Sequence, residues 1–185
     1  MDSKLVYIIS LALSAVAAGF YYYSGKGKDL DIKSTEDFFS NAEKLQITQT
    51  NEKGQLYAKA NIENALQWAN SENAELNLVT GTLYQDGLPN ASFSTNQLLI
   101  QNNYQNIDLL GNIVLKKIDP QGNTIISFKT DKLQGDTKTN QIKTDHLVLI
   151  TNPQAQFTSQ GLNANLSTGQ YEFFNIRGKY NAVSQ

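Results

Sequence analysis

The sequence predicts an all-β fold, a folded-over sheet or jelly roll made of repeated strand pairs, preceded by one N-terminal apolar helix. Three observations predict it. A hexamer, Phe93–Leu98, reappears as Phe128–Leu133 about 35 residues later, and a fixed period of this size is typical of one supersecondary unit used repeatedly. Apolar and polar residues alternate over much of the chain, which is a strand signature. Only three Pro occur, so few strands are interrupted.

The repeat continues beyond the hexamers, because residues further along each copy match at the same offset. Ile107, Leu109, Ile113 and Leu115 alternate in the first copy, with Gly111 between them. Their counterparts in the second copy are Ile142, Thr144, Val148 and Ile150. A period of two favours strands, so each unit is predicted to be a strand, a corner and two further strands.

The corner follows from a change of parity inside each hexamer. Phe93 and Thr95 lie on one parity, whereas Leu98 lies on the other. A strand that keeps one face inward needs an extra residue for this change, so we expect a bulge or bend at Asn96–Gln97. The second copy changes parity at the equivalent place, Asp131–Lys132.

The first segment, residues 1–25, is predicted to be a transmembrane anchor. Leu5–Tyr23 is an uncharged apolar run of about 19 residues, which is close to the minimum that spans a bilayer. The aromatic cluster Phe20–Tyr23 lies at one end of it, where interfacial aromatic residues are expected. A removed signal peptide is the alternative, because Ala15–Ala17 resembles a small-residue cleavage site. Residues 26–44 are predicted to be a polar linker.

The remaining segment, residues 45–185, is the β body, and its first copy of the repeat is degenerate. Asn51–Gly54 is a hairpin-type turn. Ala58 and Ala60 fall one period before the Phe and Thr of the first clear hexamer. The last strand is expected within Tyr171–Tyr180. Three alternating residues are expected along the strand after the first hairpin: Ala74, Leu76 and Leu78.

Composition excludes most catalytic chemistry. Lys and Arg number 15 against 17 Asp and Glu, so nothing indicates nucleic acid binding. There is no Cys, which excludes disulfides, thiolate metal sites and thiolate nucleophiles. His146 is the only His, and its parity places it with Thr144 and Val148 in a structural role. We therefore predict no enzyme activity, no cofactor and no metal.

The motifs together resemble the LptC family. The likeness rests on the apolar N-terminal run, the turn ending in Gly54, the two Phe-x-Thr-[Asn/Asp]-x-Leu steps and Thr158–Leu162, and it reaches to about Tyr180. The resemblance implies a twisted, OstA-like jelly roll in a single-pass protein of the Gram-negative inner membrane, with its C-terminal domain in the periplasm.

The resemblance also implies a role in lipopolysaccharide transport. Permease subunits of an inner-membrane ABC transporter would hold the anchor helix. The jelly roll would accept lipopolysaccharide from that transporter and pass it to a soluble periplasmic bridge protein with the same, LptA-like fold. ATP hydrolysis would occur elsewhere.

Two sets of residues follow from this reading. The interior trough that binds lipid is predicted to contain Phe93, Thr95, Ile107, Leu109, Ile113, Leu115, Phe128, Ile142, Val148, Ile150, Phe157 and Phe173. The partner-docking residues are predicted to be Gly54, Gly161, Tyr171, Phe174, Ile176 and Tyr180.

Two other functions fit the same pattern. The chain could be a membrane-anchored β scaffold or interaction module whose core is dry and binds no lipid. It could also be a carbohydrate-active jelly roll, in which Trp68 and the Tyr residues would stack on sugars. Packing is the commoner use of such aromatic residues, and paired carboxylates such as Glu72 and Glu75 have the pattern of solvated positions.

Overall fold

A computed structural model describes residues 39–51, 53–68, 73–102, 104–165, 167–168 and 170–180. These residues form a single antiparallel sheet of twelve strands. The strands are β1 (Phe39–Thr50), β2 (Leu56–Trp68), β3 (Ala74–Gln85), β4 (Leu88–Gln101), β5 (Asn106–Ile118), β6 (Thr124–Asp136), β7 (Gln141–Thr144), β8 (Val148–Thr151), β9 (Ala155–Ser159), β10 (Leu162–Asn165), β11 (Gln170–Phe173) and β12 (Arg177–Tyr180). The predicted all-β class is confirmed for this part of the chain.

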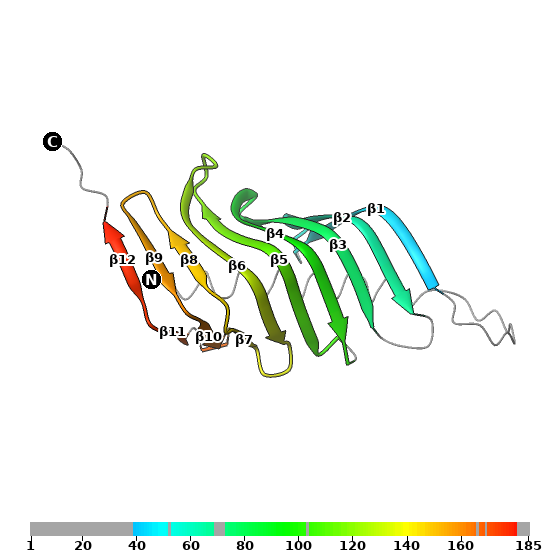
Figure 1. The fold of residues 1–185 in the computed structure, drawn as a ribbon. Coiled ribbons are helices and arrows are strands. Elements are labelled where there is room, and N and C mark those ends of the chain that lie inside the picture. Colours follow the sequence, from blue (N-terminus) through cyan, green and yellow to red (C-terminus); the bar gives the residue numbers. More distant parts are fainter. Residues whose placement is uncertain are drawn as a thin grey trace, which may run out of the picture.

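The first six strands are long and pair in sequence order, with β1 at one end of the sheet (Figure 1). The sheet then divides, because β6 pairs with β8 through residues 127–129 and with β7 through residues 134–136. One branch continues from β7 to β10 and β11, and the other from β8 to β9 and β12. Each later pair of short strands is therefore one long strand interrupted at a corner.

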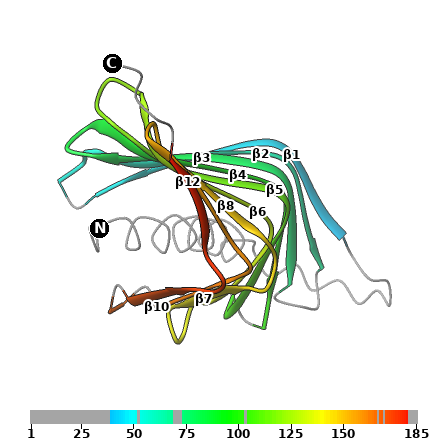
Figure 2. The ribbon, with the colours of Figure 1, turned by 60° about the vertical axis from the view of Figure 1, so that its left-hand side comes forward.

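Figure 2 shows that the sheet is folded over along these corners, so that its two halves face each other. We name each half after the short strand that it contains. The β8 wing consists of β8, β9, β12 and residues 45–50, 56–62, 79–85, 88–95, 113–118 and 124–130. The β7 wing consists of β7, β10, β11 and residues 39–43, 64–68, 74–77, 97–101, 106–110 and 132–136. The inward face of each wing is the face turned toward the other wing.

Hydroxyl groups hold the corner on alternate strands. The Thr95 hydroxyl donates to the carbonyl oxygens of Gln97 and Leu110, at 3.0 and 3.1 Å. Thr130 and Ser159 hold the equivalent places and each donates to the carbonyl two residues further on, at 3.4 and 2.6 Å. Each hydroxyl therefore adds a hydrogen bond to a carbonyl at the point where its strand bends.

The intervening strands turn the corner by a different device, a left-handed backbone. Positive φ occurs at Lys44 (53°), Leu78 (51°), Gly111 (72°), Asn112 (48°) and Asn175 (50°). Gly and Asn adopt this conformation readily, whereas a Leu there is strained. Hydroxyls therefore hold the corners of β4, β6 and β9–β10, and a left-handed backbone makes those of β1, β3, β5 and β11–β12.

The predicted change of parity is confirmed in both clear copies. Pairing of β4 with β5 skips from Ser94 to Gln97, and pairing of β5 with β6 skips from Leu110 to Ile113. Thr95 is 3% exposed and Leu98 is 1% exposed, so both parities point inward on either side of the bend.

Three expectations need correction. Leu78 does not continue the inward alternation of its strand, because it lies at the corner with φ 51° and is 58% exposed, while Val79 takes the buried place. Ala60, not Ala58, stands level with Phe93, since both pair with Gly81. The strands also begin before the predicted boundary at residue 45, because β1 starts at Phe39.

The predicted anchor, Leu5–Tyr23, and most of the predicted linker lie outside the described residues. Within the residues that the structure does describe, no helix has the length and apolar character needed to cross a membrane.

Candidate functional site

An apolar row crosses the inward face of the β8 wing. Phe93 pairs with Leu115, Leu115 with Phe128, Phe128 with Ile150, and Ile150 with Phe157. Residues directly opposite in neighbouring strands have side chains on the same face and in contact range. Phe93 and Ile150 are buried, and the other three are half-buried. The row is therefore a continuous apolar surface across five strands, β4, β5, β6, β8 and β9.

Glycines end this row on both sides. Gly81 pairs with Phe93, and Gly178 pairs with Phe157. A Cβ atom at Gly81 would collide with the Phe93 ring, and one at Gly178 would lie 2.7 Å from Cδ1 of Phe157. Each aromatic ring thus lies over the backbone of the neighbouring strand, where only Gly leaves room for it.

The β7 wing carries matching rows. Leu109 pairs with Leu98 and with Leu133, and all three are at most 2% exposed. A second row contains Ile100, Ile107, Gly135, Ile142 and Ala164, each paired with the next. One apolar cluster contains buried residues of both wings, among them Phe93 and Ile113 of the β8 wing and Leu98, Leu109 and Leu133 of the β7 wing.

The predicted interior residues all lie on the inward face. Those that are buried are Phe93, Thr95, Ile107, Leu109, Ile113, Ile142, Val148 and Ile150. Those that are half-buried are Leu115, Phe128, Phe157 and Phe173. The Thr95 hydroxyl already donates to two carbonyls, so its role is to hold the corner. Contact of any of these residues with lipid stays a prediction.

The predicted docking residues divide between two places. Tyr171, Phe174 and Ile176 are 41, 40 and 55% exposed and lie along the last edge of the sheet. Tyr180 ends β12 at the same edge. Gly54 is not brought together with them, because it occupies the β1–β2 hairpin turn with φ +75° at the other end of the strand order.

Gly161 lies close to this last edge and is buried in the corner between β9 and β10. A Cβ atom there would lie 2.8 Å from the Thr144 carbonyl oxygen and 3.0 Å from Cδ2 of Phe174. The Ser159 hydroxyl also donates to the Phe174 carbonyl, at 2.8 Å. Gly161 and Ser159 therefore fix the backbone from which the Phe174 side chain is exposed.

Ser159 belongs to a third copy of the corner motif that the sequence reading missed. Phe157, Ser159 and Leu162 repeat the spacing of Phe93, Thr95 and Leu98, with Ser in place of Thr. The signal could have been found by accepting either hydroxyl residue and by relaxing the fixed period, since this copy follows its predecessor at a shorter interval.

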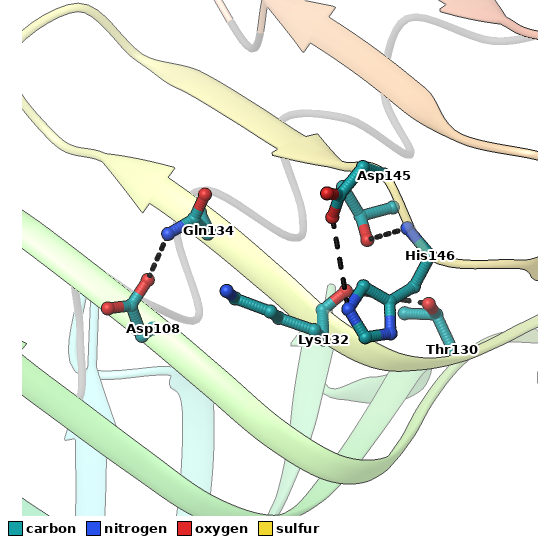
Figure 3. Close-up of polar contacts among 7 residues, drawn as sticks. Asp108, Thr130, Lys132, Gln134, Asp145 and His146 are labelled. Atoms are coloured by element: carbon teal, nitrogen blue, oxygen red, sulfur yellow. Dashed lines mark hydrogen bonds and ion pairs between the residues drawn. The ribbon is translucent and has the colours of Figure 1, made fainter.

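His146 does not share the buried parity that was predicted for it. It lies at the bend between β7 and β8, 47% exposed, with Nε2 3.8 Å from Oδ1 of Asp145 (Figure 3). Its backbone N–H donates to the Thr144 hydroxyl, which helps to hold that corner. In the described part of the chain no cluster of three or more His, Cys, Asp or Glu could hold a metal ion.

The other polar pairs near this bend are also structural. The Gln134 amide donates to Oδ1 of Asp108 at 3.0 Å across neighbouring strands (Figure 3). The carboxyl of Asp136 accepts hydrogen bonds from the backbone of Thr139 and the side chain of Gln105, which lower its pKa. The carboxylates of Asp108 and Asp136 thus have hydrogen-bond partners in a neighbouring strand or a turn. What distinguishes the inward face is its apolar rows.

Comparison with known proteins identifies the family to which the chain belongs. No curated protein matches the chain. A family model, described as lipopolysaccharide-assembly, LptC-related, matches residues 6–181. That match covers the entire folded sheet and most of the chain before it. The chain therefore belongs to the LptC-related family, and its function lies in lipopolysaccharide transport in the cell envelope.

Proposed function

We propose that this chain is a single-pass inner-membrane protein whose folded sheet accepts lipopolysaccharide from an ABC transporter and passes it to a soluble periplasmic partner. Residues 1–25 form the anchor, held by the permease subunits, and residues 26–38 lead from it into β1, which begins at Phe39. The uncharged run Leu5–Tyr23 and the family match support this assignment. The chain itself carries out no chemical step.

The carrying observation is the alignment of apolar side chains into rows on the inward faces of both wings. Phe93, Leu115, Phe128, Ile150 and Phe157 are paired from strand to strand, so an acyl chain laid across the strands meets apolar contacts at each one. Each methylene removed from water contributes about 0.8 kcal/mol. The sugars and phosphates of the lipid stay outside, where polar side chains and water surround them.

The last edge of the sheet is the exit. Within the described chain, β11 pairs only with β10 and β12 only with β9, so the outer backbone groups of both strands are open. A partner with the same fold can add its own strands there, and exposed Phe174 and Ile176 add apolar contact. Its rows would then continue those of this chain.

Photo-crosslinking tests the lipid site. A benzophenone amino acid replaces Ile107, Phe128 or Val148 in cells, and each variant is probed for a lipopolysaccharide adduct after irradiation. Matched controls occupy the outward face of the β7 wing, at Asp108 and Lys143, which directly follow the inward residues Ile107 and Ile142. Adducts are expected from the inward positions only.

Two results would separate the alternatives. Equal capture from inward and outward positions would show that lipid does not enter between the wings. Absence of lipid adducts, together with a protein adduct from Tyr171, would favour the scaffold function over lipid transfer.

A further inference from the structure

Charge is divided between the two wings. In the described residues, the strands of the β8 wing contain no carboxylate, and their charged residues are Lys59, Lys116, Lys117, Lys129, Arg177 and Lys179. The strands of the β7 wing contain both signs and more acids than bases, namely Glu43, Glu75, Asp108, Asp136 and Glu172 with Lys132 and Lys143. The strands of the two wings therefore differ in charge, and the carboxylates Asp86 and Asp119 of the β8 wing are confined to its turns.

Four of the basic residues, Lys116, Lys129, Arg177 and Lys179, form a patch on the outward face of the β8 wing. Each lies one position away from a residue of the apolar row or its terminal glycine, so its side chain points to the opposite face. All four are exposed, and none makes an ion pair with a described residue. They lie on β5, β6 and β12, which span four strand spacings or about 19 Å.

Uncharged residues lie between these cations. Ser127 and Thr151 separate Lys116 from Gln156, which in turn pairs with Lys179. In the neighbouring row, Leu149 and Thr158 separate Lys129 from Arg177. The side chains between the cations are therefore uncharged, and the basic groups are the only charged groups of these two rows.

Apolar side chains are exposed at the tip of the same wing. Ile125 is 44% exposed and is the unpaired residue at the register shift between Thr124 and Ile126. Leu88, the first residue of β4, is 51% exposed at the neighbouring hairpin. Asp86 and Asp119 lie in the turns at this tip, so the cations that face an anionic surface are those of the basic patch along the strands, and the tip contributes exposed apolar side chains.

We infer that the outward face of the β8 wing rests on the anionic surface of a phospholipid bilayer. Cations distributed over about 19 Å match an extended charged surface better than a single phosphate, which needs converging groups. The carboxylates of the β7 wing are repelled by the same surface, which fixes the orientation. This inference rests on the proposed anchor, which keeps the sheet beside the membrane.

A second copy of the chain is a poorer occupant for this face. Its β7 wing would offer Glu75 and Asp108, but Glu75 already accepts hydrogen bonds from Asn77 and Gln97, and Asp108 accepts one from Gln134. Lys132 and Lys143 also lie on the β7 wing, and their positive charges would be repelled by the basic patch.

The test uses fluorescence quenching on the full-length chain, which has no Cys, so that one introduced Cys carries the only label. Gln156→Cys labels the basic face, and Asn163→Cys labels the outward face of the β7 wing. Each is reconstituted in nanodiscs of phosphatidylcholine, with or without phosphatidylglycerol, that contain a spin-labelled phospholipid. Quenching at Gln156→Cys, and not at Asn163→Cys, is expected to rise with phosphatidylglycerol and to fall with added salt.

Charge removal completes the test. The variant with Lys116, Lys129, Arg177 and Lys179 all changed to Gln is expected to lower the ratio of docked to undocked sheet by about fivefold for each residue. A matched variant changes four basic residues elsewhere, Lys44, Lys132, Lys138 and Lys143, and is expected to retain the quenching. Circular dichroism of both variants verifies that the sheet is intact.

Equal quenching at the two labels, or quenching that ignores phosphatidylglycerol in chains that co-elute with nanodiscs, would overturn the inference. Shielding of the Gln156→Cys label that depends on protein concentration and not on lipid would assign the face to a second copy. Failure to co-elute with nanodiscs would instead refute the anchor, and the crosslinking experiment tests lipid transport separately.

Discussion

Replacing Ser159 by Ala tests the hydroxyl-held corner. The Ser159 hydroxyl is 1% exposed and donates to the carbonyl oxygens of Gly161 and Phe174, at 2.6 and 2.8 Å. Ala removes this donor, but both carbonyl oxygens keep a backbone partner, because Gly161 accepts from the Phe174 N–H and Phe174 accepts from the Gln160 N–H. Loss of the hydroxyl contacts therefore costs about 0.5–1.5 kcal/mol. That range corresponds to a roughly 2- to 13-fold increase in local opening, concentrated where β11 and β12 meet β10 and β9.

Hydrogen exchange of the full-length protein in mild detergent measures this opening. Amides of residues 170–180 are expected to exchange faster in Ser159→Ala, while those of β4 keep their rates. Ser159→Thr is expected to restore protection, because Thr95 and Thr130 perform the same role. Ser94→Ala is the control, since that half-buried Ser shows no side-chain hydrogen bond. Unchanged exchange at residues 170–180 in Ser159→Ala would refute the reasoning.

Three further substitutions test other corners and turns. Gly161→Ala puts a Cβ atom 2.8 Å from the Thr144 carbonyl oxygen and is expected to lower the free energy of unfolding by about 1–3 kcal/mol in urea titrations; an unchanged midpoint would show that the corner relaxes freely. Leu78→Asn is expected to raise the free energy of unfolding by about 1 kcal/mol, and with it the urea midpoint, because Asn tolerates φ 51° better and the Leu side chain is exposed. A lower midpoint would mean that the Leu78 side chain packs against its neighbours. Hydrogen bonds from Asn123, of which the one from its side chain has the largest effect, lower the pKa of Asp119 in the folded state. The stabilisation that they give is complete above the pKa of the unfolded state, and it is lost as the pH falls through the lower pKa of the folded state. Asp119→Ala is expected to flatten the acid limb of stability against pH, and an unchanged acid limb would contradict this.

The repeated bent strand could be predicted from the sequence, because its apolar residues change parity at the bend. Phe93 and Leu98 can both point inward only if the strand changes phase between them, and the pairing shows that it does. The inward face was predictable for the same reason, since alternation identifies it without knowledge of the partner strands.

Other features of the fold could not be predicted from one sequence. Leu78 was misplaced because Leu78 and Val79 are both apolar, so the sequence does not show which of them points inward after the corner. His146 was misplaced because alternation was extended through the bend between β7 and β8. The register of β2 was misread by two residues because Ala58 and Ala60 are equally small and equally acceptable inward. The division of the sheet after β6 depends on pairings between distant strands, which local patterns do not encode.

That division has a consequence for which proteins can join the sheet. Its final boundary consists of two four-residue strands, β11 and β12, separated by the bend at Phe174–Ile176. A straight β-strand from an unfolded neighbour can hydrogen-bond to one of them but not to both. A four-residue strand offers it only a few backbone hydrogen bonds. Only a chain that bends at the same point gains the full set of hydrogen bonds, so the geometry itself rejects indiscriminate aggregation while admitting a relative of the same shape.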